Sequence, residues 1–304
     1  MGSQDIKTVR MLLAAVRGQD QPPLSELRAR YDGISAMFSL PDGVTFEKID
    51  AGGVPAERLC GRSSLAGRTI LYLHGGGYAI GSPVSHRHVA GALVDAAEAT
   101  LVVPDYRLAP EHKYPCAIHD ALAAYSWLLD GGQDPKQLII AGDSAGGGLA
   151  LATMISVRNQ GLPLPAAAVL ISPWVDLAGT GATLDTLQAR DPVVQKAGLL
   201  DMATYYLGER DPRTPLASPL YADLTGLPPL LIQVGTEEVL LDDSLRLNHR
   251  AREQGVSTTL EVWDEMIHVW HFFHPQLQEG REAIGRVGDY IREHVATPRA
   301  AAVA

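Results

Sequence analysis

Cysteine and long hydrophobic runs are scarce in this 304-residue chain. The two cysteines, Cys60 and Cys116, cannot supply the four ligands of a structural zinc site and are too few for a disulfide framework. The apolar run at residues 11–16 is shorter than the core of a secretory signal, and no small-residue cleavage site follows it. No segment approaches the ~18 consecutive apolar residues of a membrane span. We therefore expect a cytoplasmic protein without membrane insertion.

Positive charge is also in the minority. With 25 Lys and Arg against 35 Asp and Glu the formal net charge is −10, and such a field repels the phosphates of nucleic acids. The composition, 46% hydrophobic and 20% charged, is typical of a globular protein and excludes disordered, collagen-like and coiled-coil classes. The sequence therefore predicts a folded globular protein, of a length that is common among α/β folds, with no nucleic-acid partner.

Short β-branched runs alternate with longer helical patterns along most of the chain. The expected strands are residues 69–73, 101–103, 138–141, 169–172, 230–234 and 258–262. The expected helices are residues 84–97, 117–129, 145–157, 244–253 and 281–294. This alternation predicts a mostly parallel central sheet with helices on both faces, and residues 44–50 and 55–60 form an expected antiparallel pair at its edge.

Two stretches depart from this alternation. In the N-terminal stretch, apolar residues repeat with helical spacing at Val9, Leu12, Leu13 and Val16, and again at Ile34, Met37 and Phe38. The second stretch, residues 176–226, is far longer than the usual connection of about 2–6 residues. We expect both stretches to form a helical layer over the sheet.

The chain contains a motif typical of a nucleophilic serine. Gly142-Asp143-Ser144-Ala145-Gly146 matches G-x-S-x-G and stands between an expected strand and an expected helix. The two glycines leave room for a sharp turn that holds the serine in a strained conformation. A glycine-rich turn with an incidental serine is the alternative, but the strand-turn-helix context favours a nucleophile at Ser144.

A second glycine cluster, His74-Gly75-Gly76-Gly77-Tyr78, follows another strand. Glycines let backbone N–H groups approach a developing oxyanion, so we assign the oxyanion hole to the N–H groups of Gly76, Gly77 and Ala145. A phosphate-binding loop is the competing interpretation. Both nucleotide templates fail, because Ile80 replaces the third glycine of G-x-G-x-x-G and Gly148 stands where a P-loop needs lysine. We therefore expect no nucleotide cofactor.

Ser144 needs a general base, and His268 follows the last expected strand. His271 and His274 continue a three-residue spacing that could indicate a metal site. The pattern lacks the glutamate of H-E-x-x-H and drifts around a helix, so we expect no bound metal. His74 is expected to brace the oxyanion loop.

Four acids compete to orient the histidine. They follow the strand expected at 230–234, and they are Glu237, Glu238, Asp242 and Asp243. The role needs a carboxylate on the loop that leaves the strand, which favours the two glutamates. Asp242 and Asp243 are expected to cap the next helix, where negative charge is stabilising.

In combination these motifs resemble the hormone-sensitive-lipase-like group of α/β-hydrolases, the bacterial family IV carboxylesterases, over essentially the full length. The segment Asp105–Glu111 followed by Tyr114-Pro115 looks like that group's signature, which we interpret as architectural. Matching the group's D-P-L-x-D-[DE] pattern onto residues 238–243 implies Glu238 as the acid, where the group more usually has aspartate.

The resemblance implies an α/β-hydrolase fold with N-terminal cap helices at residues 1–43 and a catalytic domain at 44–304. An insertion in that domain, near residues 176–226, is expected to contribute to the cap. It also implies a serine carboxylesterase acting on small neutral esters of short to medium acyl chain, without a cofactor, and allows a homodimer. Candidate pocket residues are Met37, Phe38, Tyr78 and Leu207. A lactone hydrolase, a deacetylase and a non-catalytic ligand-binding protein of the same fold are the alternatives.

Overall fold

The structure, a computed structural model, describes residues 4–16, 22–35 and 38–295. Eight strands form one sheet in the order β1-β2-β4-β3-β5-β6-β7-β8. Their bounds are β1 Thr45–Asp50, β2 Pro55–Cys60, β3 Thr69–Leu73, β4 Thr100–Pro104, β5 Leu138–Asp143, β6 Ala167–Ile171, β7 Leu230–Gly235 and β8 Thr258–Trp263. Strand β2 runs antiparallel to both β1 and β4, and the other neighbours are parallel. The predicted sheet and its antiparallel edge are confirmed.

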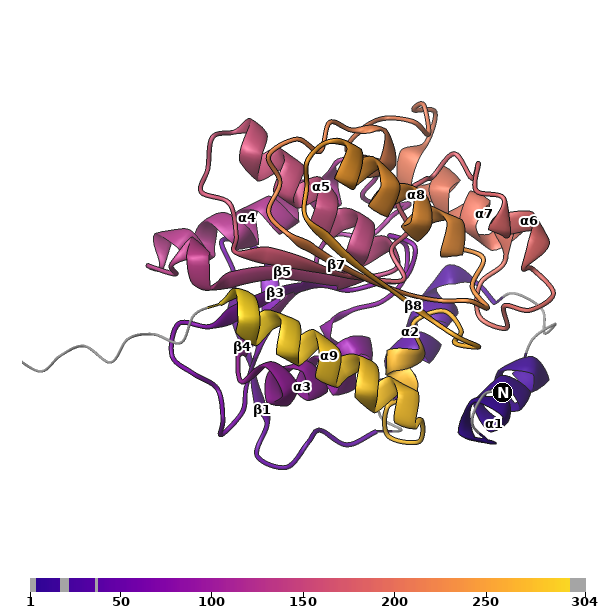
Figure 1. The fold of residues 1–304 in the computed structure, drawn as a ribbon, viewed down its shortest axis with the longest axis horizontal. Helices are drawn as coiled ribbons and strands as arrows, with labels where there is room; N and C mark the ends of the chain where they lie inside the picture. Colours follow the sequence, from indigo (N-terminus) through magenta and orange to yellow (C-terminus); the bar gives the residue numbers. More distant parts are fainter. Residues whose placement is uncertain (1–3, 17–21, 36–37, 296–304) are drawn as a thin grey trace, which may run out of the picture.

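Helices cover both faces of the sheet (Figure 1). They are α3 Pro83–Ala97, α4 Cys116–Asp130, α5 Ala145–Asn159, α8 Leu241–Glu253 and α9 Gln278–His294. Alternate residues of β3 enter different cores: Leu71 and Leu73 join the core with α4 and α5, while Ile70 and Tyr72 join the core with α3 and α9. Burial on both faces explains why the central strands are continuously apolar.

The two stretches outside the alternation are helical, as expected. The N-terminal stretch forms α1 Gln4–Val16 and α2 Leu24–Ser35, and the insertion contains α6 Thr183–Thr186, α7 Lys196–Leu207 and the short 3₁₀ turn Pro219–Tyr221. Figure 1 places α1, α2, α6 and α7 on one side of the molecule, at the right of the view. No helix in the described ranges is long and apolar enough to cross a membrane.

The apolar stripe expected on α1 is wrong at one position. Leu12 is 67% exposed, whereas Ile6 and Val9 are buried against a cluster that includes Met266 and Trp270. The buried stripe is Ile6, Val9 and Leu13, spaced by three and four residues, and Leu12 lies about 100° away from Leu13 around the helix.

Candidate active site

Ser144 lies on a strained turn between β5 and α5. Its backbone has φ 52° and ψ −122°, a conformation that costs energy for any residue with a side chain. The flanking glycines are required by space: a Cβ added to Gly146 would lie 1.9 Å from the carbonyl oxygen of Leu73, and one added to Gly142 would lie 2.3 Å from that of Gly146. The predicted strand-turn-helix context is therefore present.

Three backbone N–H groups beside this turn lack acceptors. Gly76 and Gly77 have positive φ values of 113° and 61°, and Ala145 is the first residue of α5. None of their N–H groups donates a hydrogen bond to any described residue, whereas the preceding Gly75 N–H donates to Asp143 Oδ1 at 3.0 Å. The three N–H groups assigned from the sequence to the oxyanion hole are therefore among the donors of these turns that have no described acceptor.

A buried polar network supports the glycine loop. Asp143 accepts hydrogen bonds from Tyr72 at 2.7 Å and from Gly75, and His86 lies 3.4 Å from the same carboxylate. Burial opposes the charge of Asp143, yet His86 and the Tyr72 hydroxyl hold the pKa of this carboxyl below its ordinary value. The network fixes Gly75 and so the course of the loop.

His74 braces the same loop, as expected. Its Nδ1 lies 2.8 Å from the carbonyl oxygen of Gly75, its ring stacks on Tyr106 with centroids 4.1 Å apart, and Tyr106 donates to the His74 carbonyl at 2.7 Å. Burial lowers the pKa of His74 to about 3, so the ring is neutral near pH 7.

Glu238 and His268 form a buried pair. His268 Nδ1 lies 2.9 Å from Glu238 Oε2, while Glu238 Oε1 accepts from the Ser172 hydroxyl at 2.7 Å and from Gly235 N–H at 2.6 Å. Burial alone would lower the pKa of His268, but the hydrogen bond and negative charge of Glu238 outweigh it and raise that pKa. This arrangement is that of an acid that orients a base.

The backbone joins Ser144 to this pair. Ser144 N–H donates to the carbonyl of Ile171 at 2.9 Å, and the next residue, Ser172, bonds Glu238 through its hydroxyl. Among the described residues the Ser144 hydroxyl itself takes part in no hydrogen bond. Bonds between nucleophile and base often form only with substrate in place, so the serine and the histidine remain compatible partners.

Ser172 is a site residue that the sequence reasoning missed. It is buried, has a positive φ of 45°, and also accepts from Val269 N–H at 3.2 Å, one residue beyond His268. No sequence motif marks Ser172. The only available signal is that a buried carboxylate such as that of Glu238 needs a second hydrogen-bond partner.

Glu237 has a different partner from its neighbour. Its buried carboxylate pairs with Arg190 of the insertion and with Arg10 of α1, at 3.2 Å. Arg10 also donates to the carbonyl of Arg190 at 2.9 Å. Glu237 therefore links the two helical stretches to the loop that carries Glu238.

Asp242 and Asp243 lie at the N-terminus of α8, as expected, but the expectation that they cap its backbone N–H groups is wrong. Both lie in its first turn, but Asp242 accepts from Ala182 N–H at 2.9 Å, and Asp243 accepts from Val175 N–H and Asp176 N–H at 3.0 Å. Backbone N–H groups of residues 175, 176 and 182, where the insertion begins, bind these carboxylates in place of the N–H groups of the helix.

The remaining histidines of the three-residue series have structural partners. His271 Nε2 lies 2.8 Å from Gln233 Oε1, and the His274 ring stacks on His88. Burial lowers the pKa of His271 to about 3 and that of His274 to about 4. Within residues 4–16, 22–35 and 38–295, no three acidic, histidine or cysteine side chains are arranged to hold a metal ion.

The predicted pocket residues have varied surroundings. Met37 lies outside the described residues, Phe38 is half-buried with its ring 4.8 Å from that of His88, and Tyr78 and Leu207 are buried in the main core. Their contact with substrate stays a prediction.

Met202 of α7, which the sequence reasoning missed, lies against the glycine loop. A Cβ on Gly77 would stand 2.9 Å from Met202 Cγ. This side chain therefore packs beside a donor of the proposed oxyanion hole, a position that only the tertiary structure reveals.

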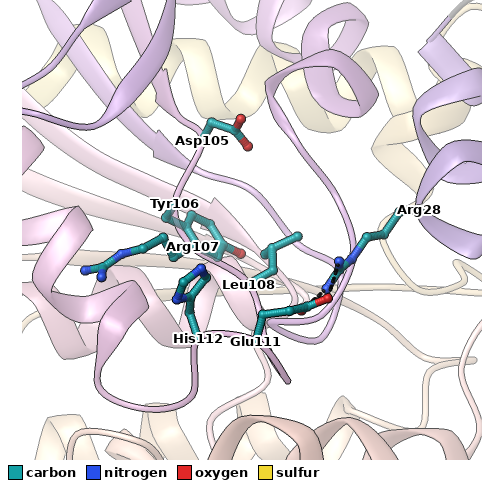
Figure 2. A pocket seen from close by; sticks show the side chains of 7 residues that line it. All are labelled: Arg28, Asp105, Tyr106, Arg107, Leu108, Glu111 and His112. Carbon is teal, nitrogen blue, oxygen red and sulfur yellow. Dashed lines mark hydrogen bonds and ion pairs between the residues drawn. The ribbon is translucent and has the colours of Figure 1, made fainter. Parts of the chain in front are cut away.

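A surface hollow of about 330 Å³ lies behind the glycine loop, over the segment predicted to be architectural. Figure 2 shows its lining, Arg28, Asp105, Tyr106, Arg107, Leu108, Glu111 and His112. The Tyr106 hydroxyl reaches from this segment to the carbonyl of His74. Arg107 pairs with Asp120 and Arg28 pairs with Glu111, both at 2.7 Å, so the two arginines of the hollow have structural partners.

Comparisons with known proteins agree with this geometry. A family model described as the alpha/beta hydrolase fold matches residues 70–272. The chain is 55% identical over 226 residues to an acetyl-hydrolase of Streptomyces hygroscopicus, covering 74% of this chain and 76% of that relative.

Solved structures are similar over nearly the whole chain. An esterase from the bacterial hormone-sensitive lipase family is 42% identical with a TM-score of 0.95, covering 97% of this chain and 100% of that chain. EstE5 soaked with p-nitrophenyl butyrate is 46% identical with a TM-score of 0.93, covering 96% and 99%.

Proposed function

Because this chain belongs to the α/β-hydrolase family and is a carboxylic ester hydrolase of the hormone-sensitive-lipase group, we propose that it works as a serine carboxylesterase with a Ser144-His268-Glu238 triad. The observation that carries the proposal is the coincidence of a strained, isolated serine with unused backbone donors and a buried Glu238–His268 pair at 2.9 Å.

The triad works by moving one proton. Glu238 accepts from His268 Nδ1–H, which leaves Nε2 as the base that takes the Ser144 proton while Oγ bonds to the ester carbonyl carbon. The protonated histidine then gives that proton to the leaving alkoxide as the carbon–oxygen bond breaks. Water repeats the sequence on the acyl-enzyme, releasing the acid and restoring Ser144.

The free donors stabilise the charge that develops on the ester oxygen. The N–H groups of Gly76, Gly77 and Ala145 need no rearrangement to receive it, because no described residue accepts from them. Each preorganised donor of this kind contributes roughly 10²–10³ in rate. Every step therefore uses side chains and backbone of this chain.

We propose short-chain neutral esters as substrates. The relative named acetyl-hydrolase is 55% identical, and EstE5, 46% identical, was soaked with a butyrate ester. The first relative's name also supports a second candidate on the same machinery, removal of acetyl groups from amines or sugars.

Residues 1–43 and the insertion near 176–226 form the proposed cap of the catalytic domain. The pairing of Glu237 with Arg10 and Arg190 supports this role, because it joins both stretches beside the triad acid. A homodimer and a cytoplasmic location remain predictions, and the molar mass in solution tests the former.

The decisive experiment compares the wild type with Ser144→Ala on p-nitrophenyl esters from acetate to palmitate. Ser63→Ala is the matched control, because Ser63 is an exposed serine outside the site. We expect activity that peaks at short chains in the wild type and in Ser63→Ala and that is lost in Ser144→Ala. Equal turnover in all three proteins would contradict the proposal, and release of acetate from acetylated amines but not esters would favour the second candidate.

A further inference from the structure

We propose that Arg28 of α2 is a positioning residue that holds the oxyanion hole in its working shape, an inference that rests on the function proposed above. The residue lies in the N-terminal stretch, outside the triad and outside the glycine loop. Its guanidinium nevertheless ends at the back of that loop, and in Figure 2 it points toward Glu111.

The guanidinium of Arg28 makes four hydrogen bonds to two segments. Nε donates to the carbonyl of Ala79 at 2.8 Å, and Nη2 donates to that of Ala109 at 2.8 Å. The same group binds Glu111 through both carboxylate oxygens, at 2.9 and 2.7 Å. Arg28 therefore ties the glycine loop to the segment behind it.

Ala79 belongs to the turn that presents the free donors. The carbonyl of Gly76 accepts from Ala79 N–H at 3.1 Å and from Ile80 N–H at 2.9 Å, which closes the turn. Ala109 N–H donates to the carbonyl of Tyr78 at 2.8 Å, so both carbonyls that Arg28 binds belong to one connected unit.

This turn needs external support. Gly76, Gly77 and Tyr78 are three successive residues with positive φ, and Tyr78 has a full side chain. Glycine adopts positive φ without strain, whereas the conformation of Tyr78 persists only where its surroundings over-determine it. Buried contacts support the turn from the sheet side through His74 and Asp143, and Arg28 supplies the support from the α2 side.

The bonding pattern requires arginine rather than lysine. A planar guanidinium can bind a carboxylate with two parallel bonds and still reach carbonyls to its side, whereas an ammonium donates from a single point. The hydrogen bond from Arg28 also lowers the pKa of Glu111 to about 2, so this pair stays charged across the working pH range. The Arg28 side chain is 27% exposed, so its substitution does not leave a fully buried cavity.

The test measures kcat and KM separately for Arg28→Lys and Arg28→Ala on p-nitrophenyl butyrate. The oxyanion hole acts mainly in the transition state, so we expect kcat to fall on the order of 10- to 100-fold, with KM within twofold of the wild type. Arg30→Ala is the matched control, because Arg30 lies on the same helix and pairs only with exposed Glu26 among the described residues. It should keep wild-type kinetics.

Two further measurements separate positioning from a general loss of structure. The affinity for a trifluoromethyl ketone, whose adduct with serine places an oxyanion in the hole, should fall in proportion to kcat/KM in Arg28→Lys. Added ethylguanidinium should partly restore kcat in Arg28→Ala and have no effect on Arg28→Lys. If Arg28→Ala does not fold, Glu111→Gln tests the same unit and should lower kcat severalfold.

Wild-type kcat in folded Arg28→Lys and Glu111→Gln would overturn the inference, as would an effect confined to KM. Either result leaves the proposed function intact provided that Ser144→Ala is inactive. Activity in Ser144→Ala would instead overturn the proposed function.

Discussion

The Ser172 hydroxyl donates a 2.7 Å hydrogen bond to Glu238 Oε1, and this contact joins the end of β6 to the proposed acid of the triad, whose other oxygen lies 2.9 Å from His268 Nδ1. Glutamate is one methylene longer than the aspartate usual at this place in the group, so its carboxylate has an additional torsion to fix. Ser172 and Gly235 N–H hold one oxygen and His268 holds the other. Both oxygens of the longer acid are thereby held by buried partners.

Loss of the Ser172 hydroxyl should therefore loosen the triad. In Ser172→Ala one buried oxygen of Glu238 loses a donor, which costs about 1–3 kcal/mol of folding free energy. We expect kcat/KM to fall about tenfold, because the carboxylate can then turn away from His268. Urea unfolding and ester kinetics measure the two effects, with Ser63→Ala as the control. Unchanged kinetics would mean that Gly235 N–H alone orients Glu238.

The pH profile should report the Glu238–His268 contact. His268 must be neutral to act as a base, and Glu238 raises its pKa, so activity should fall as the pH drops through a value above 6.5, the ordinary pKa of histidine. In Glu238→Gln the charge is gone, so this acidic limb should move to lower pH while kcat falls by roughly 10²–10⁴.

Glu237→Gln is the matched control for that experiment, since it removes the adjacent carboxylate. Glu237 pairs with Arg10 and Arg190, and the carboxylate bonded to His268 is that of Glu238, so this variant should keep the acidic limb of the wild type and lose stability instead. An unshifted limb in Glu238→Gln, or a shifted one in Glu237→Gln, would contradict the assignment of the acid.

The sequence was sufficient for the parts of the site that local geometry dictates. G-x-S-x-G marks a turn that needs glycine at 142 and 146, and the order of strands places His268 after β8. It could not choose between Glu237 and Glu238 from spacing alone, because both leave β7 on the same loop. The family pattern selected Glu238, and the 2.9 Å contact with His268 agrees with that choice.

Residues that act through distant partners escaped the sequence reasoning for a common reason. Ser172 meets a carboxylate 66 positions away, and Arg28 meets carbonyls 51 and 81 positions away. No periodicity records such contacts. Leu12 and Asp242 were misassigned for a related reason, since what surrounds α1 and α8 decides which side chains are buried and which donors a carboxylate finds.

Stability should depend on pH through Asp243. Burial, together with the nearby charge of Asp176, raises the pKa of Asp243 from 3.8 to about 7. The folded state therefore holds a proton that the unfolded chain has released between pH 4 and 7, so the free energy of unfolding falls as pH rises through that window and levels off above it.

Replacing Asp243 with asparagine should remove this loss. The amide oxygen can still accept from Val175 N–H and Asp176 N–H, and the group no longer titrates. Between pH 5 and pH 8 we expect the free energy of unfolding of Asp243→Asn to rise, relative to that of the wild type, by at least about 1 kcal/mol. This difference corresponds to roughly one pKa unit. Urea unfolding at both pH values measures it, with exposed Asp42→Asn as the charge-matched control. If the free energy of unfolding of Asp243→Asn declined with rising pH as steeply as that of Asp42→Asn, the role of Asp243 would be refuted.

Met202 should limit the length of the acyl chain. Its side chain lies against Gly77, beside a donor of the proposed oxyanion hole, so a longer acyl group must compete with it for space. In Met202→Ala we expect kcat/KM for p-nitrophenyl octanoate, divided by that for the acetate, to rise about tenfold. Removing the longer side chain frees space for additional methylene groups of the substrate, and such space changes the discrimination between acyl chains by roughly 1–3 kcal/mol. Leu200→Ala changes an exposed residue of the same helix and should leave the ratio unchanged. A constant ratio in Met202→Ala, with the protein folded, would place the acyl group on another side of the hole.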